Sequence, residues 1–144
     1  MIKNVASIIS FIAILLIPSF AKADTLDHDS TVDVCSVFKT AIDSNTNLET
    51  TSEFMAIAEF GRACVLILPR SSIALKCYYS GVEAIYYERA YNLYKTDKYL
   101  NSTGSRIALG NAEYAWIVAS RYCINDAKEH ANKKAFELDI KLDP

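Results

Sequence analysis

LGNAEYAWIVASRYCI, residues 109–124, decides the fold, because it contains the only Trp of the chain and one of its four Cys. Steps of three or four residues separate Leu109, Ala112, Trp116, Ala119 and Cys123. In an α-helix this spacing places all five side chains on one stripe. Small residues beside Trp116 let a neighbouring helix approach closely, and a cystine at Cys123 would hold that neighbour covalently. We therefore predict a helix against which the other helices dock.

Further helices are predicted on both sides of this stretch. The first runs to about Ser44 with Ser30 or Thr31 as its cap, the second ends before Pro69, the third spans residues 73–95, and the fourth runs from about Arg106 into the polar tail. No strand-like alternation and no internal repeat interrupts this pattern. The predicted fold class is all-α, a small four-helix bundle stapled by disulfides.

The second helix carries the clearest local signals. Thr50 and Glu53 have the spacing of a capping box, in which each side chain satisfies a backbone donor of the other residue. Gly61 lies in the middle of this helix, where glycine costs about 1 kcal/mol relative to alanine. Such a glycine most often indicates close packing against another helix.

The first 23 residues have the layout of a secretory signal. Lys3 precedes an apolar run from Ile8 to Ile17, and Ala21-Lys22-Ala23 forms a small-residue exit. The run is shorter than the roughly 20 residues of a membrane span. We expect cleavage after Ala23, a single helical domain over residues 24–144, and a periplasmic or secreted protein without stable membrane insertion.

All four Cys lie within residues 24–144, in a compartment where disulfides persist. The sequence permits three pairings. Cys64 lies five residues before Pro69 and Cys77 lies eight residues after it, so a helical hairpin with a short turn would bring these two roughly level. We therefore predict Cys64–Cys77, which leaves Cys35–Cys123.

Charge and motif content exclude several functions. Without Lys3 and Lys22, 13 of the 15 basic residues remain against 17 acidic ones, a net charge of −4, which disfavours binding to nucleic acid. No metal-binding, phosphate-binding or nucleophile motif is present. The acids among apolar neighbours are Glu59, Glu83, Glu88 and Glu113. Each also fits a helix-surface acid, and Glu83 or Glu113 could equally pair with an Arg. We predict no catalytic residues, no cofactor and no metal.

The third predicted helix contains two stripes of tyrosine. One stripe includes Tyr79 and Tyr86, and the other consists of Tyr87, Tyr91 and Tyr94. Two interpretations stay open. Either one stripe is a contact surface for a partner, since Tyr provides a large area with a polar tip, or both are packed with their hydroxyls at the surface.

Two segments resemble a known family. Residues 112–117, AEYAWI, followed by Arg121 and Cys123, are similar to the A-Q-R-A-W-I-x-x-R-D-x-x-C signature of the lysozyme-inhibitor LprI N-terminal family, in which Trp116 and Arg121 belong to the structural motif. Cys64 and Cys77 match the early Cys pair of that family, and residues 88–94, ERAYNLY, resemble its D-x-x-L-N-x-x-Y helix. Departures are present too: Glu113 replaces Gln, Arg121 is one residue late and Cys123 one residue early relative to the signature.

The resemblance implies an envelope protein that binds and blocks a lysozyme-type muramidase or another cell-wall hydrolase. Such an inhibitor would present acidic and aromatic side chains to a basic, carbohydrate-binding cleft. The contact set expected on this basis is Glu83, Tyr87, Glu88, Tyr91 and Tyr94. The alternatives are a periplasmic immunity protein that neutralises a delivered toxin and a non-enzymatic assembly subunit of the envelope.

Overall fold

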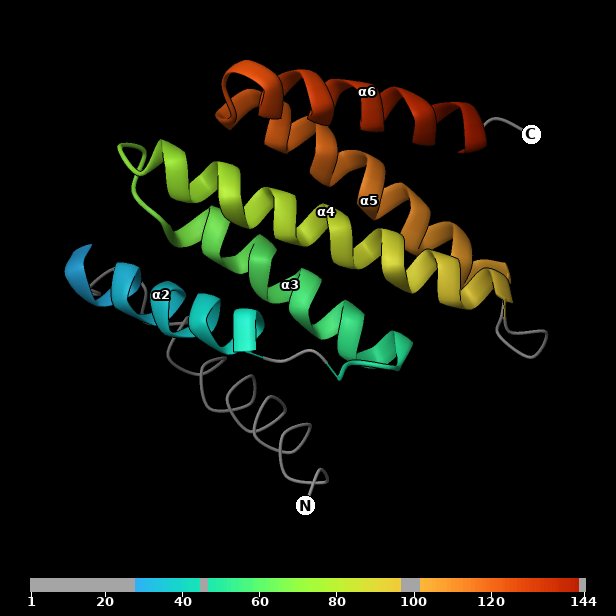
Figure 1. The fold of residues 1–144 in the computed structure, drawn as a ribbon, viewed down its shortest axis with the longest axis horizontal. Coiled ribbons are helices and arrows are strands. Elements are labelled where there is room, and N and C mark those ends of the chain that lie inside the picture. The colour runs from blue at the N-terminus through green and yellow to red at the C-terminus, as the bar shows by residue number, and fades with distance from the viewer. Residues whose placement is uncertain (1–27, 45–46, 97–101, 143–144) are drawn as a thin grey trace.

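The computed structural model describes residues 28–44, 47–96 and 102–142, and its regular elements are all α-helices (Figure 1). These are α2 (His28–Ser44), α3 (Thr51–Ile67), α4 (Ile73–Thr96), α5 (Ser102–Tyr122) and α6 (Asn125–Leu142). The predicted all-α class is confirmed, although the described ranges hold five helices where four were expected. The expected signal segment, residues 1–23, lies outside these ranges.

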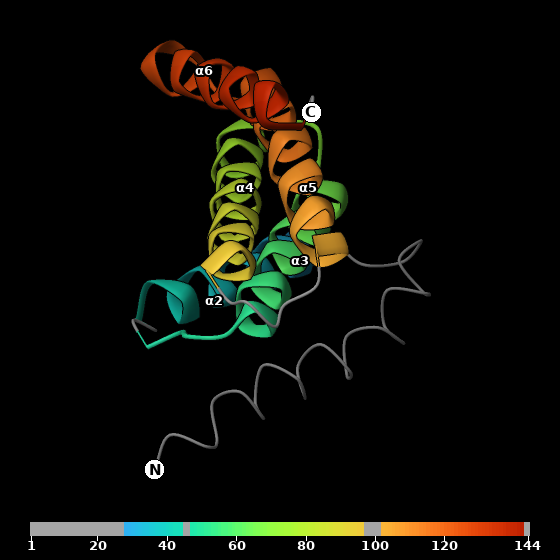
Figure 2. The same ribbon diagram turned by 90° about the vertical axis from the view of Figure 1, so that its right-hand side faces the viewer.

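The central helix is α4, which packs against α3 on one side and α5 on the other. α6 packs on α5, and α2 touches α3 on the opposite flank of the molecule (Figures 1 and 2). Short turns join α3 to α4 and α5 to α6 at the same end of the bundle (Figure 1). No helix in the described ranges is both long and apolar enough to traverse a lipid bilayer.

The stripe predicted on α5 forms the core of the molecule. Its members Leu109, Ala112, Trp116, Ala119 and Cys123 are all buried, with no more than 7 % of any of them exposed. Small side chains on α4, among them Ala84 and Ala90, are fully buried in the same layer. Alanine on both helices permits the close approach that the sequence predicted, and the larger Trp116 fills the remaining space.

Close packing at Gly61 is also confirmed. A Cβ added there would lie 3.0 Å from the backbone oxygen of Tyr79 and 3.1 Å from the backbone nitrogen of Glu83. Both atoms belong to the backbone of α4, so they do not move aside as a flexible side chain would. Gly61 therefore lies at a close contact between the backbones of α3 and α4.

Local signals set both ends of α3 as predicted. The Thr50 side chain accepts the backbone N–H of Glu53, and the Glu53 carboxylate accepts the backbone N–H of Thr50, which completes the capping box. Hydrogen bonding by Thr50 lowers the pKa of Glu53. The helix ends at Ile67, with Leu68 as its C-cap immediately before Pro69.

The predicted disulfide pairing is wrong. Cys35 bonds Cys64, which joins α2 to α3, and Cys77 bonds Cys123, which joins α4 to α5. Lys76 faces α3, because its ammonium donates to the backbone oxygen of Val65. The next residue on a helix points about 100° away, so Cys77 faces α5. The prediction failed because spacing around Pro69 does not determine the direction in which the Cys77 side chain points.

The predicted single helix after Arg106 is also wrong, because it breaks into α5 and α6. Asn125 begins α6 and has a positive φ of 51°, a left-handed conformation that Asn tolerates better than most residues. The bridge from Cys77 holds the chain at Cys123, just before this break. The chain then reverses, and α6 packs on α5 through Ala131 and Leu138.

We predict that Gly61→Ala lowers the free energy of unfolding by about 1–2 kcal/mol, because overpacking against the α4 backbone outweighs the gain in helix propensity. Gly81→Ala is the matched control, since a Cβ there meets nothing within 4 Å. It should raise stability by about 0.5–1 kcal/mol. Urea denaturation followed by circular dichroism measures both values, and equal stabilisation by the two changes would contradict close packing at Gly61.

We predict that the two cystines differ in their resistance to reduction. Cys35 and Cys64 are fully buried, whereas Cys77 is half-buried. A thiol reductant reaches an exposed sulfur first, because exchange requires direct attack on it. Partial reduction of the folded protein followed by alkylation and peptide mapping should label Cys77 and Cys123 before the other pair. Labelling of Cys35 first would contradict this order.

Candidate functional site

The predicted tyrosine contact surface on α4 is not exposed. Glu83 and Tyr87 are buried, with 2 % and 0 % exposure, and Glu88, Tyr91 and Tyr94 are only partly accessible. The sequence left two interpretations open, one stripe exposed to a partner or both stripes packed. Neither stripe of α4 is free, because α3 covers one of its sides and α5 covers the other. The predicted contact set is therefore part of the interior and its margin.

Glu88 connects three helices instead of facing a partner. The indole N–H of Trp116 on α5 donates to one oxygen of its carboxylate, and the ammonium of Lys134 on α6 lies 3.2 Å from the other. The His130 ring meets Trp116 edge-on at a centroid distance of 5.4 Å. Trp116 therefore packs where α4, α5 and α6 meet, while Arg121 is exposed in the last turn of α5.

A second polar cluster lies where α3, α4 and α5 meet. Arg62 on α3 donates from Nε to the carboxylate of Glu83 at 2.7 Å, and from its terminal nitrogen to the side-chain oxygen of Asn111 on α5 at 3.4 Å. The Glu83 side chain is 3 % exposed and that of Arg62 is 32 % exposed. Burial raises the pKa of Glu83 above 4.5, and Arg62 opposes this shift. Hydrogen bonds to α4 and α5 therefore fix the guanidinium of Arg62, and part of it remains accessible to solvent.

Tyr87 holds an exposed acid at the same place. Its hydroxyl donates to the carboxylate of Glu59 on α3, whose side chain is 54 % exposed. The Arg62 guanidinium lies 3.9 Å from that carboxylate and 5.4 Å from the centre of the Tyr87 ring. Burial, together with the hydrogen bond to Glu59, raises the pKa of Tyr87. The buried phenol therefore stays protonated at neutral pH and fixes the orientation of Glu59.

These contacts place two exposed rows next to each other. Glu59, Arg62 and Leu66 follow one another along α3 at helical spacing, as do Ile107, Asn111 and Tyr114 along α5. The Arg62–Asn111 hydrogen bond joins the two rows at their middle members. We call these six residues the α3/α5 face. Leu66 is 76 % exposed, Tyr114 55 % and Ile107 51 %.

We compared the chain with models of protein families, with curated proteins and with solved structures. None of them matches it.

The α3/α5 face combines ordered charged groups with exposed apolar side chains. Hydrogen bonds from the buried Glu83 and Tyr87 order its charged groups, and its apolar side chains are exposed to solvent. Within the described ranges, no group of three or more His, Cys, Asp or Glu side chains is placed to hold a metal ion. Arg, Tyr and large apolar side chains in an ordered patch are typical of protein–protein contacts.

The sequence patterns present Glu59 and Glu83 as separate acids. They do not indicate that Arg62, Leu66 or Tyr114 belongs to a common exposed face. A signal for the exposure of the last two was present, because each is a large apolar side chain out of phase with the buried stripe of its own helix. Of the interpretations left open for Glu83, pairing with an Arg is the one that the structure shows. Its partner lies 21 residues away on another helix, which no local pattern indicates.

We predict that Arg62→Leu lowers the free energy of unfolding by about 3 kcal/mol at neutral pH, because it leaves the buried Glu83 carboxylate without its cation. A raised folded pKa means that protonation favours the folded state, so this carboxyl weakens stability as the pH rises from 4.5 through its folded pKa. The loss should therefore shrink as the pH falls toward 4.5. Urea denaturation across this range measures it.

Glu83→Gln is the matching control, because it removes the charge and keeps the shape. Combined with Arg62→Leu, it should recover most of the stability lost at neutral pH and remove the pH dependence. If the double variant were as unstable as Arg62→Leu alone, the unpaired charge would not be the cause.

Proposed function

We propose that this protein is a non-enzymatic, exported protein of the cell envelope that binds and inhibits a lysozyme-type cell-wall hydrolase through the α3/α5 face. The observation that supports this proposal is the arrangement around Arg62. The ordered guanidinium of Arg62 lies beside the exposed carboxylate of Glu59. The exposed aromatic ring of Tyr114 belongs to the same α3/α5 face.

Charge favours this kind of partner. The chain has a net charge of −2, and a lysozyme-type cleft is basic and binds carbohydrate. Complementary charge accelerates encounter, whereas buried aromatic and apolar groups determine how long the complex lasts. Glu59 suits the first role, and Tyr114 with Leu66 suits the second. These residues take the place of the tyrosines of α4 that the sequence suggested.

Preorganisation also supports an inhibitory role. Glu83 and Tyr87 fix Arg62 and Glu59 before any partner arrives, so less side-chain entropy is lost on binding. The two cystines each join a pair of helices, and such bridges persist in oxidising compartments such as the periplasm. The resemblance of residues 112–123 to the lysozyme-inhibitor LprI N-terminal family agrees with this proposal.

The test measures clearing of a peptidoglycan suspension by lysozyme-type muramidases in the presence of the oxidised protein. We expect inhibition that depends on the concentration of the protein. The double variant Glu59→Lys/Tyr114→Ala should weaken it by about tenfold or more, because truncation at the centre of an interface typically costs more than about 1 kcal/mol per residue.

A matched control changes one exposed acid and one exposed apolar residue elsewhere, Glu49→Lys/Ile85→Ala, and should inhibit like the natural protein. Equal loss in both variants, or no inhibition by the natural protein, would contradict the proposal. Affinity capture from envelope extract separates the alternatives. A delivered amidase in the bound fraction would favour an immunity protein, and a subunit of an envelope machine would favour an assembly role.

A further inference from the structure

α6 carries apolar side chains on two opposite faces. Ala131 and Leu138 point inward and are buried against α5. Phe136 and Ile140, one helical turn apart, point outward and are 66 % and 58 % exposed. α6 lies at the edge of the bundle, and its outer side faces away from the other labelled helices (Figures 1 and 2). An exposed aromatic beside an exposed aliphatic residue on a peripheral helix is typical of an association surface.

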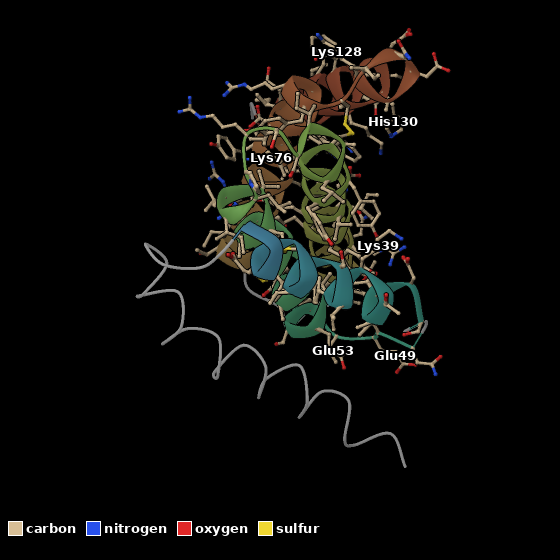
Figure 3. All side chains as sticks on the ribbon, turned by 90° about the vertical axis from the view of Figure 1, so that its left-hand side faces the viewer. Lys39, Glu49, Glu53, Lys76, Lys128 and His130 are labelled. Carbon is tan, nitrogen blue, oxygen red and sulfur yellow. A yellow bond between two sulfur atoms is a disulfide. The ribbon has the colours of Figure 1, made fainter. Side chains whose placement is uncertain are left out.

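The charges of α6 show what kind of partner this surface fits. The helix holds four Lys and four acidic residues, so its net charge is zero when His130 is neutral. Neither a strongly basic nor a strongly acidic partner would gain from approaching it. Figure 3 shows Lys128 and His130 at the upper edge of the molecule, far in that view from the acids Glu49 and Glu53. A surface of balanced charge fits a partner that is also balanced.

The order of charges around Phe136 sets the direction of approach. Lys133 and Glu137 flank Phe136 and are four residues apart, with 74 % and 45 % of their side chains exposed. Their own contact within the helix is weak, at 4.0 Å. If a second α6 lay parallel, each Lys133 would face the Lys133 of the other copy. In an antiparallel arrangement, each Lys133 lies level with Glu137 of the other copy, and the two Phe136 rings meet near the two-fold axis.

We infer that α6 is a self-association surface, on which a second copy of this chain docks with its own α6 antiparallel. Phe136 and Ile140 fill the seam, and Lys133 and Glu137 of each copy pair across it. Such a contact is isologous, since both copies use the same residues. An 18-residue helix is about 27 Å long, so one pair of helices gives a small interface and a reversible dimer. The α3/α5 face takes no part in this contact.

Analytical ultracentrifugation of the oxidised protein tests this inference. We expect a monomer at low micromolar concentration and a growing fraction of dimer toward the millimolar range. Phe136→Glu should abolish the dimer, because it places two like charges at the axis. Val37→Glu, which replaces a 71 % exposed residue on α2, is the matched control and should leave the dimer unchanged. A monomer at every concentration, or equal loss in both variants, would overturn the inference.

Charge reversal tests the antiparallel order. Lys133→Glu and Glu137→Lys should each weaken dimerisation, because each creates like charges across the seam. An equimolar mixture of the two variants should form a heterodimer, since every pair across the seam is then opposite in sign. The contact within each helix stays repulsive in this mixture, so a rescue reports pairing between copies. The order of the helices is read from the single variants, because in a parallel pair the natural charges across the seam are already alike and neither change would weaken the dimer. If circular dichroism shows both variants folded and the mixture stays monomeric, the antiparallel order is wrong. Inhibition assays do not enter this readout, so its outcome is independent of the proposed function.

Discussion

The contact between the backbones of α3 and α4 at Gly61 determines the geometry of the candidate site. Because the two helices nearly touch there, the next residue, Arg62, reaches Glu83 with a hydrogen bond of 2.7 Å. Also on α3, the carboxylate of Glu59 accepts a hydrogen bond from the hydroxyl of Tyr87. A hydrogen bond requires a narrow range of distance and angle, so a side chain at position 61 that pushed the helices apart would weaken both contacts. The absence of one methyl group thereby orders the charges of the α3/α5 face.

α4 supplies this support because its polar side chains point into the bundle. Glu83, Tyr87 and Glu88 each bind a group from a neighbouring helix, and no buried side-chain nitrogen or oxygen in the described ranges lacks a hydrogen-bond partner. A buried polar network of this kind favours one arrangement of helices, because any other arrangement would leave charges unpaired. The flanking helices are then free to present groups to solvent.

Sequence patterns predicted those features that depend on one helix alone. The capping box of Thr50 and the buried stripe around Trp116 are of this kind, since spacing within a helix determines them. The predicted cystines were wrong and the exposure of Tyr87 stayed open, because both depend on which neighbour covers which side of α4. Lys76 and Cys77 illustrate this: adjacent in sequence, they contact different helices. The α3/α5 face could not be predicted for the same reason.

The order of the cystines bears on how the chain is oxidised. Cys35 bonds Cys64 and Cys77 bonds Cys123, so each cysteine pairs with the next one along the chain, over separations of 29 and 46 residues. In a chain that crosses a membrane with its N-terminus first, the first two thiols meet an oxidase before the others arrive. Indiscriminate oxidation in that order yields the native bridges directly. If this chain is exported in that way, its bridges would need no disulfide isomerase, whereas the nested pairing would need slow reshuffling.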